Sequence, residues 1–155
     1  MNRDKYQDGL LISAIQNGTV IDHITGGEAL IVLRILGITG STGECVSVAT
    51  NVESGALGKK DVVKIENREL LAEEVDRIAL IAPHATINII RNRRVVEKKG
   101  VVIPEILVGV LCCPNPCCIT NTNEPVLSRF SVQGERLICE YCDTMISSDI
   151  SSHII

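Results

Sequence analysis

The sequence CCPNPCC at residues 112–118, followed by CEYC at residues 139–142, indicates how the last third of this chain folds. A pair of cysteines with four residues between them is followed there by a pair with two residues between them. Each short spacing lets two cysteines of one turn bind the same metal ion, and zinc prefers four cysteine ligands of this kind in a tetrahedron. An all-cysteine site has no open coordination position, so the spacing predicts a structural zinc ion.

The second pair is Cys139 and Cys142, but spacing alone leaves the first pair open. Cys112 with Cys117 fits as well as Cys113 with Cys118, and a mixed pair would also fit. A redox C-x-x-C or a set of buried thiols is the alternative interpretation, although a redox motif does not explain two cysteine clusters. The chain has seven cysteines, an odd number that fits a disulfide framework poorly.

Charge divides the chain near residue 100. Residues 1–100 hold 13 basic and 13 acidic side chains, whereas residues 101–155 hold two arginines and six acids. The polar run EKKG at 97–100 lies at the same place. We therefore predict two domains, 1–100 and 101–155. The acidic, cysteine-rich domain would repel phosphate backbones, so we expect no nucleic-acid partner.

The longest apolar runs are far shorter than the ~20 residues that a membrane span needs, and no signal-peptide layout opens the chain. We therefore expect a cytoplasmic protein without a membrane partner. Aromatic residues make up only 2% of the sequence, so the core must be aliphatic.

Hydrophobic periodicity in the first domain predicts alternating strands and helices. Strands are expected at 19–24, 45–52, 59–66, 86–90 and 94–98, and helices at 28–36 and 69–81. The expected inner stripe of the second helix is Leu70, Leu71, Val75, Ile78 and Ala79. This order is the split β-α-β arrangement of a ferredoxin-like fold. The predicted class is α+β: an antiparallel sheet with two helices on one face, plus a small all-β zinc-binding domain.

Five stretches of sequence carry a family resemblance over about residues 10–148. CPNPCCITNTNEPV at 113–126, followed by CEYC, resembles the zinc domain of the regulatory chain of aspartate carbamoyltransferase. GTVIDHI at 18–24, SGALGKKDVVKIEN at 54–67 and APHATINIIRN at 82–92 match the remainder of that chain.

The resemblance implies a non-catalytic regulatory subunit in pyrimidine biosynthesis. In this family the first domain binds CTP as inhibitor and ATP as activator, with UTP as a further candidate, and it pairs regulatory chains into homodimers through its sheet. The zinc domain docks on the catalytic chain. The resemblance also selects the ligands of one structural Zn²⁺ ion: Cys113, Cys118, Cys139 and Cys142. Cys112 and Cys117 would then be extra thiols that pack or line a pocket.

The resemblance further implies nucleotide contacts along the sheet. These positions are Ile12, Ala14, Ile15, Val20, Asp22, His23, Lys60, Lys64, Asn88, Ile90, Arg93, Val95 and Lys98. Their chemistry agrees, because lysines and His23 can meet phosphates while Asp22 can accept ribose hydroxyls. The alternative is that the lysines are merely solvated strand charges. Arg93 stands where a tyrosine is familiar and Ser13 where a glutamate is, so we expect triphosphate binding with shifted base selectivity.

Two other classes of function are less well supported. A zinc-ribbon nucleic-acid module is disfavoured by the acidic zinc domain and by the lack of aromatic stacking platforms. An enzyme is disfavoured because the sequence shows no evident pairing of a nucleophile with a base.

Overall fold

The first domain is a five-stranded antiparallel sheet. The computed structural model describes residues 15–55 and 57–155. The strands are β1 (Gly18–Thr25), β2 (Val46–Ser54), β3 (Gly58–Glu66), β4 (Thr86–Arg91) and β5 (Arg94–Gly100), and their order in the sheet is β2-β3-β1-β4-β5. The first four strands have the connectivity of a ferredoxin-like fold, and β5 extends the sheet at the β4 edge. The predicted fold class is confirmed.

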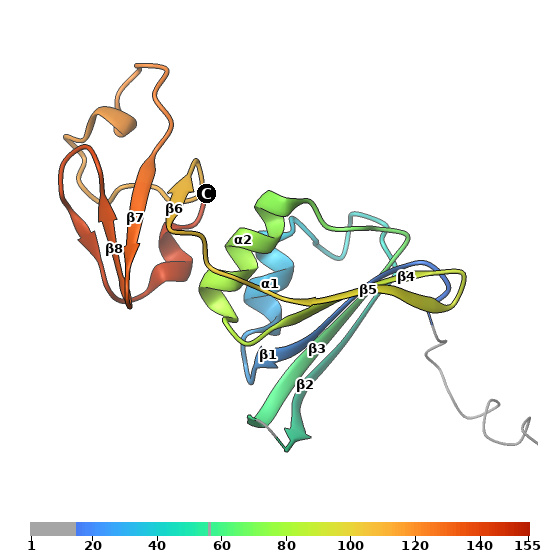
Figure 1. The fold of residues 1–155 in the computed structure, drawn as a ribbon. Coiled ribbons are helices and arrows are strands. Elements are labelled where there is room, and N and C mark those ends of the chain that lie inside the picture. The colour runs from blue at the N-terminus through green and yellow to red at the C-terminus, as the bar shows by residue number, and fades with distance from the viewer. Residues whose placement is uncertain (1–14, 56) are drawn as a thin grey trace, which may run out of the picture.

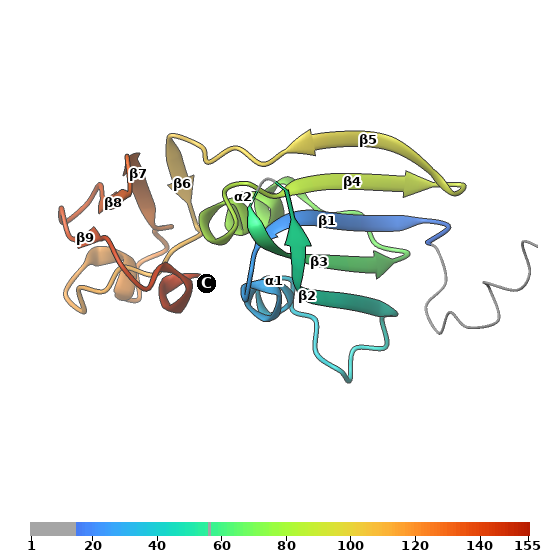
Figure 2. The same cartoon turned by 90° about the horizontal axis from the view of Figure 1, so that it is seen from below.

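Both helices, α1 (Ala29–Ile35) and α2 (Ala72–Ile81), lie on one face of this sheet (Figures 1 and 2). Between them and the sheet is an aliphatic core that includes Ile21, Val32, Val63 and Ile78, all fully buried. The other face of the sheet carries no helix from the described residues.

The second helix begins later than its sequence pattern predicts. Leu71 precedes the helix in an extended conformation, with φ −77° and ψ 155°, and its side chain is 62% exposed. Its backbone N–H donates to the Glu74 carboxylate at 3.0 Å, which satisfies one of the free donors at the helix start. The prediction that Leu71 faces inward is therefore wrong, whereas Ile78 and Ala79 are buried as expected.

The second domain is a small four-stranded antiparallel sheet. Its strands are β6 (Ile106–Val108), β7 (Arg129–Gln133), β8 (Arg136–Cys139) and β9 (Met145–Ile146), with 3-10 helices η2 (Ile119–Asn121) and η3 (Ile150–His153). Phe130 fills its core with Leu107 and Leu111, beside three buried cysteines. Three of the buried residues of this core are cysteines, and small domains with few buried apolar side chains need additional stabilisation.

The second domain contacts the helix layer of the first. Arg34 on α1 donates to the Ser151 carbonyl oxygen at 3.2 Å, and Arg77 on α2 donates to the Gly109 carbonyl oxygen at 3.4 Å. Leu80 of α2 packs against the core of the second domain. A change in the position of either helix would therefore alter its contacts with the second domain.

No helix among residues 15–55 and 57–155 combines the length and apolarity needed to cross a membrane.

Candidate functional site

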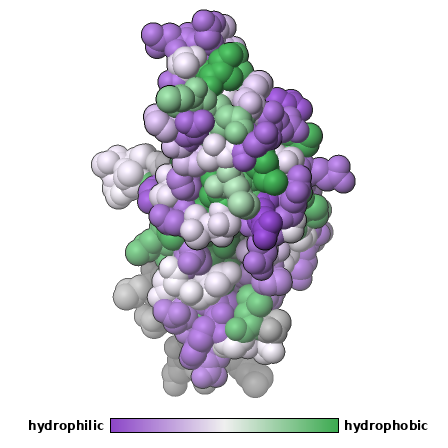
Figure 3. All heavy atoms as spheres, turned by 90° about the vertical axis from the view of Figure 1, so that its left-hand side faces the viewer, coloured by the Kyte–Doolittle hydropathy of each residue, from purple (hydrophilic) through white to green (hydrophobic). Residues whose placement is uncertain are grey.

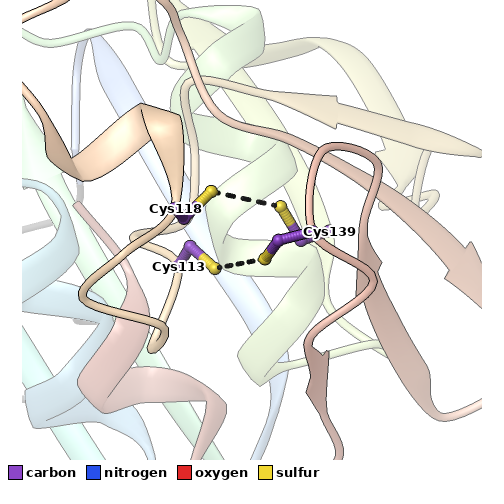
Figure 4. A group of neighbouring side chains, drawn as sticks. Cys113, Cys118 and Cys139 are labelled. Atoms are coloured by element: carbon purple, nitrogen blue, oxygen red, sulfur yellow. Dashed lines mark hydrogen bonds between the residues drawn. The ribbon is translucent and has the colours of Figure 1, made fainter.

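Four cysteine sulfurs converge at one end of the second domain. The Sγ atoms of Cys113, Cys118, Cys139 and Cys142 all lie within 4.8 Å of one another. Cys113 and Cys118 come from the loop between β6 and β7, while Cys139 ends β8 and Cys142 follows in the next turn. Figure 4 shows the sulfurs of Cys113, Cys118 and Cys139 directed toward a common centre.

The sulfur spacing fits a tetrahedral metal centre. Zinc–sulfur bonds of about 2.3 Å place tetrahedral ligands about 3.8 Å apart. The Sγ atoms of Cys113 and Cys142 are 3.5 Å apart, and those of Cys118 and Cys139 are 3.8 Å apart. Four soft donors with no room for a substrate suit one structural zinc ion.

Cys112 and Cys117 lie outside this cluster, and both are exposed. Local chain direction explains the difference. Cys112 pairs with the C-terminal segment through its backbone N–H, which donates to the His153 carbonyl oxygen at 2.7 Å, whereas the next side chain points inward. Cys113 is 3% exposed. Exposure of both thiols argues against a packing role in the core of this chain, and the expectation that they line a pocket stays a prediction.

Neighbouring hydroxyl groups support the sulfur ligands. Thr120 Oγ1 donates to Cys118 Sγ at 3.2 Å, and Thr144 Oγ1 lies 3.1 Å from Cys142 Sγ. Hydrogen bonds with Thr144 lower the pKa of Cys142 to about 6, whereas burial raises the pKa of Cys113 to about 12. Zinc binding at neutral pH must therefore displace a proton from the buried Cys113 thiol. Each threonine stands two residues after its cysteine, a signal that cysteine spacing alone did not use.

The other expected site residues lie across the open face, by which we mean the helix-free face of the five-stranded sheet. Strand register places Lys64 of β3 opposite Val20 of β1, Val20 opposite Asn88 of β4, and Asn88 opposite Lys98 of β5. Directly opposed residues point to the same side of a sheet. These four side chains therefore form one row, in which two lysines flank an amide and an apolar residue.

Asp22 is the centre of a polar group beside that row. Its Oδ1 atom accepts from Lys60 Nζ at 2.9 Å and from the backbone N–H of His23 at 2.7 Å. The His23 ring lies 3.3 Å from Thr86 Oγ1 through its Nδ1 atom. Thr86 was missed by sequence reasoning, because only the pairing of β1 with β4 brings it to Asp22.

Apolar and turn residues lie at the opposite end of the sheet. Ile90 pairs with Gly18 and with Val95, and Ile15 is 8% exposed. The backbone N–H of Arg93, in the turn between β4 and β5, donates to the Gln16 carbonyl oxygen at 2.8 Å. Ile12 and Ala14 lie outside the described residues.

Replacing Lys60 by methionine is expected to raise the pKa of Asp22. Burial alone would raise this pKa, but hydrogen bonds from Lys60 and His23 outweigh burial and lower it. The lowered pKa stabilises the fold at pH values above the ordinary value of about 3.9, and this contribution is lost as pH falls through the folded-state pKa. Lys60→Met removes the strongest lowering contact, so the Asp22 pKa should rise and the stability that Asp22 loses in acid should become smaller.

A carbon-detected NMR titration of the Asp22 carboxyl group measures this change. Lys59→Met is the control, since Lys59 lies 3.8 Å from Glu53 at the surface and is not a partner of Asp22. An Asp22 midpoint that is the same in all three proteins would contradict the expectation.

Comparison with known proteins agrees with this geometry in both domains. Residues 10–102 match the family model described as aspartate carbamoyltransferase regulatory chain, allosteric domain, and residues 105–152 match the metal binding domain of the same chain. A regulatory chain of this enzyme from Methanospirillum hungatei is 73% identical over 155 residues, covering 100% of both chains.

Two further relatives with the same name extend the match. The one from Methanoculleus marisnigri is 71% identical over 147 residues, 95% of each chain, and the one from Methanosphaerula palustris is 65% identical over 155 residues, 100% of each chain. These relatives are regulatory rather than catalytic chains, as the sequence motifs predict. This chain therefore belongs to the family of aspartate carbamoyltransferase regulatory chains.

Proposed function

We propose that this chain binds nucleoside triphosphates on the open face and conveys their effect to catalytic chains of aspartate carbamoyltransferase through the second domain. The observation that carries the proposal is the row of Lys64, Val20, Asn88 and Lys98, with the Asp22–Lys60 pair beside it. The effectors we propose are CTP and ATP, with UTP as a further candidate.

The charges of the open face suit a polyphosphate ligand. Strands lie about 4.8 Å apart, so the backbones of Lys64 and Lys98 are about 14 Å apart, three strand spacings. Their flexible side chains can approach phosphate oxygens from both sides, with Lys60 as a third cation. Lys60 Nζ lies 2.9 Å from Asp22 Oδ1, whereas the His23 ring lies 3.9 Å from Asp22 Oδ2. Oδ2 is therefore placed to accept a hydrogen bond from a ribose hydroxyl.

The apolar end of the sheet suits the base. Ile15, Ile90 and Val95 lie there, together with Arg93 at the turn between β4 and β5. An arginine side chain can stack on a base or donate hydrogen bonds to it. We propose that Arg93 changes the preference between CTP and ATP relative to the preference that a tyrosine ring at this position would give.

Lys60→Met is expected to weaken triphosphate binding about 100-fold, because it removes one charge-assisted contact and leaves Asp22 unpaired beside the phosphates. Calorimetric titration of the zinc-loaded chain with CTP, ATP and UTP measures the effect. Lys59→Met is the matched control and should bind as the unmodified chain does. If the unmodified chain gives no heat with any of the three nucleotides, the proposal fails.

Association is proposed to involve both domains. The second domain exposes several large apolar side chains, visible as green atoms among polar ones from its side of the molecule (Figure 3). The large apolar side chains that are exposed on this domain include Ile119, Leu127, Tyr141 and Met145. We propose that such side chains contact the catalytic chain, and that two regulatory chains form a homodimer through the sheet of the first domain.

Transmission of the nucleotide effect requires two arrangements of the domains that bind nucleotides with different affinities. A ligand shifts an equilibrium only by binding one state better, and coupling is commonly about 1–3 kcal/mol. The contacts of Arg34 with Ser151 and of Arg77 with Gly109 connect the helix layer to the second domain. We propose that these contacts differ between the two arrangements. We also propose a cytoplasmic location, since all seven cysteines are free thiols, which suits a reducing compartment.

A further inference from the structure

Asp61 is a buried acidic residue with no role in the site described so far. It follows Lys60 on β3, and its side chain points to the opposite, helix-covered face of the sheet, where it is fully buried. Burying a carboxyl group is costly unless its oxygens are hydrogen-bonded. A core position filled by valine or isoleucine would avoid that cost, so the contacts of this side chain are informative.

Three backbone amides from two separate segments donate to Asp61. Its Oδ2 atom accepts from the N–H groups of Gly27 and Ala29, both at 2.9 Å, and its Oδ1 atom accepts from the N–H group of Asn51 at 2.7 Å. Gly27 lies in the turn that follows β1, and Ala29 is the first residue of α1. Asn51 lies within β2.

Irregular pairing occurs on both strands next to Asp61. The register of β1 against β3 shifts between Ile21 and Ile24, and Ile24 pairs with Asp61 itself. The register of β2 against β3 shifts between Ala49 and Val52. Within these shifts His23 has φ 56° and Asn51 has φ 54°, a left-handed conformation that few non-glycine residues adopt. Such bulges reorient side chains and are common beside functional sites.

The bulge on β1 produces the arrangement of Asp22 and His23. It turns the His23 N–H group onto Asp22 Oδ1, and the same oxygen holds Lys60 Nζ. The segment after the bulge lies close against β3, since a Cβ atom on Gly26 would come within 3.2 Å of Lys59 Cβ. Asp61 holds this segment from the opposite side of the sheet through Gly27 and Ala29.

We propose that Asp61 is a positioning residue for triphosphate binding, which keeps the β1 bulge, and with it Asp22, His23 and Lys60, in the binding geometry. This inference rests on the proposed nucleotide function. The same hydrogen bonds attach the first turn of α1 to the strand that carries Lys60 and Lys64. A ligand that pulls on these lysines therefore acts on a strand joined directly to α1, whose Arg34 contacts the second domain.

Asp61→Asn tests the proposal, because asparagine keeps the shape but replaces one acceptor oxygen with an NH₂ group that faces backbone donors. We expect calorimetry with CTP and ATP on the full zinc-loaded chain to give affinities about 10-fold weaker, as small misplacements of binding groups do. The His23 amide resonance should also move. Val63→Ala is the matched control: Val63 is fully buried two residues further along the same face of β3, where it pairs with Ile21. This variant lowers stability but leaves the hydrogen bonds from Gly27, Ala29 and Asn51 to Asp61 in place. It should bind within about twofold of the unmodified chain.

Equal affinities for Asp61→Asn and Val63→Ala at matched stability would overturn the inference and leave the nucleotide function intact. Absence of binding by the unmodified chain would overturn both. If Asp61→Asn does not fold, Asp61→Glu, which keeps both oxygens but displaces them, is measured in the same way. Unchanged affinity and an unmoved His23 amide in that variant would equally overturn the inference.

Discussion

Removal of zinc from the four-cysteine cluster is expected to unfold the second domain and to leave the five-stranded sheet folded. The second core has six buried apolar side chains together with three of the cysteines, and small cores of this kind are marginal alone. Structural zinc contributes about 10–16 kcal/mol in comparable small domains. The first domain has its own aliphatic core without any of the four cysteines, so it does not depend on the metal.

Cys139→Ser is the variant that tests this expectation, with Cys117→Ser as its matched control. Both replace a thiol with a hydroxyl, but Cys139 is fully buried in the cluster whereas Cys117 is exposed outside it. Hydrogen exchange should show loss of protection in β6–β9 for Cys139→Ser, with β1–β5 still protected. The same variant should fail to associate with catalytic chains of aspartate carbamoyltransferase. Protected β7 and β8 amides in chelator-treated protein would contradict the expected role of the metal.

Gly18→Ala is expected to destabilise the first domain by about 3 kcal/mol or more, the range of severe core and backbone defects. Gly18 opens β1 with φ +145°, a conformation that side chains rarely adopt. A Cβ atom there would lie 2.1 Å from the Ile65 carbonyl oxygen, which belongs to the neighbouring strand and cannot move away alone. Both β1 and β3 would have to separate at their paired ends, where Gly18 lies opposite Glu66.

Two other glycines of the same sheet allow the cost of backbone strain to be measured apart from the cost of a steric collision. Gly58 has φ +75°, and a Cβ atom added to it would meet nothing within 4 Å, whereas Gly100 has the same open space without a positive φ. Gly58→Ala should therefore cost about 1 kcal/mol and Gly100→Ala almost nothing. Denaturant unfolding followed by the amides of β1 and β3 measures all three. A Gly18→Ala loss no larger than that of Gly58→Ala would show that the strands can adjust.

Local patterns predicted the elements well where burial is one-sided. The strand expected at 59–66 is observed as β3, in which Val63 and Ile65 are buried and Lys64 lies on the other face, because successive strand residues point to opposite faces. The pattern failed at Leu71, since an apolar residue at helical spacing does not reveal where the helix begins. Glu74 determines that start by accepting from the Leu71 N–H group.

Sequence alone determined the class of metal site and the order of strands and helices, since short cysteine spacings and hydrophobic periodicity are local properties of the chain. Cysteine spacing left the first pair open and the family resemblance selected Cys113 and Cys118; the tertiary structure supplies the physical reason, because these two side chains enter the cluster while Cys112 and Cys117 are exposed. Only strand pairing brought Lys64, Val20, Asn88 and Lys98 into one row. The contacts of Asp61 with Gly27 and Asn51 likewise join segments whose proximity depends on the whole sheet, and no local propensity encodes a contact across strands.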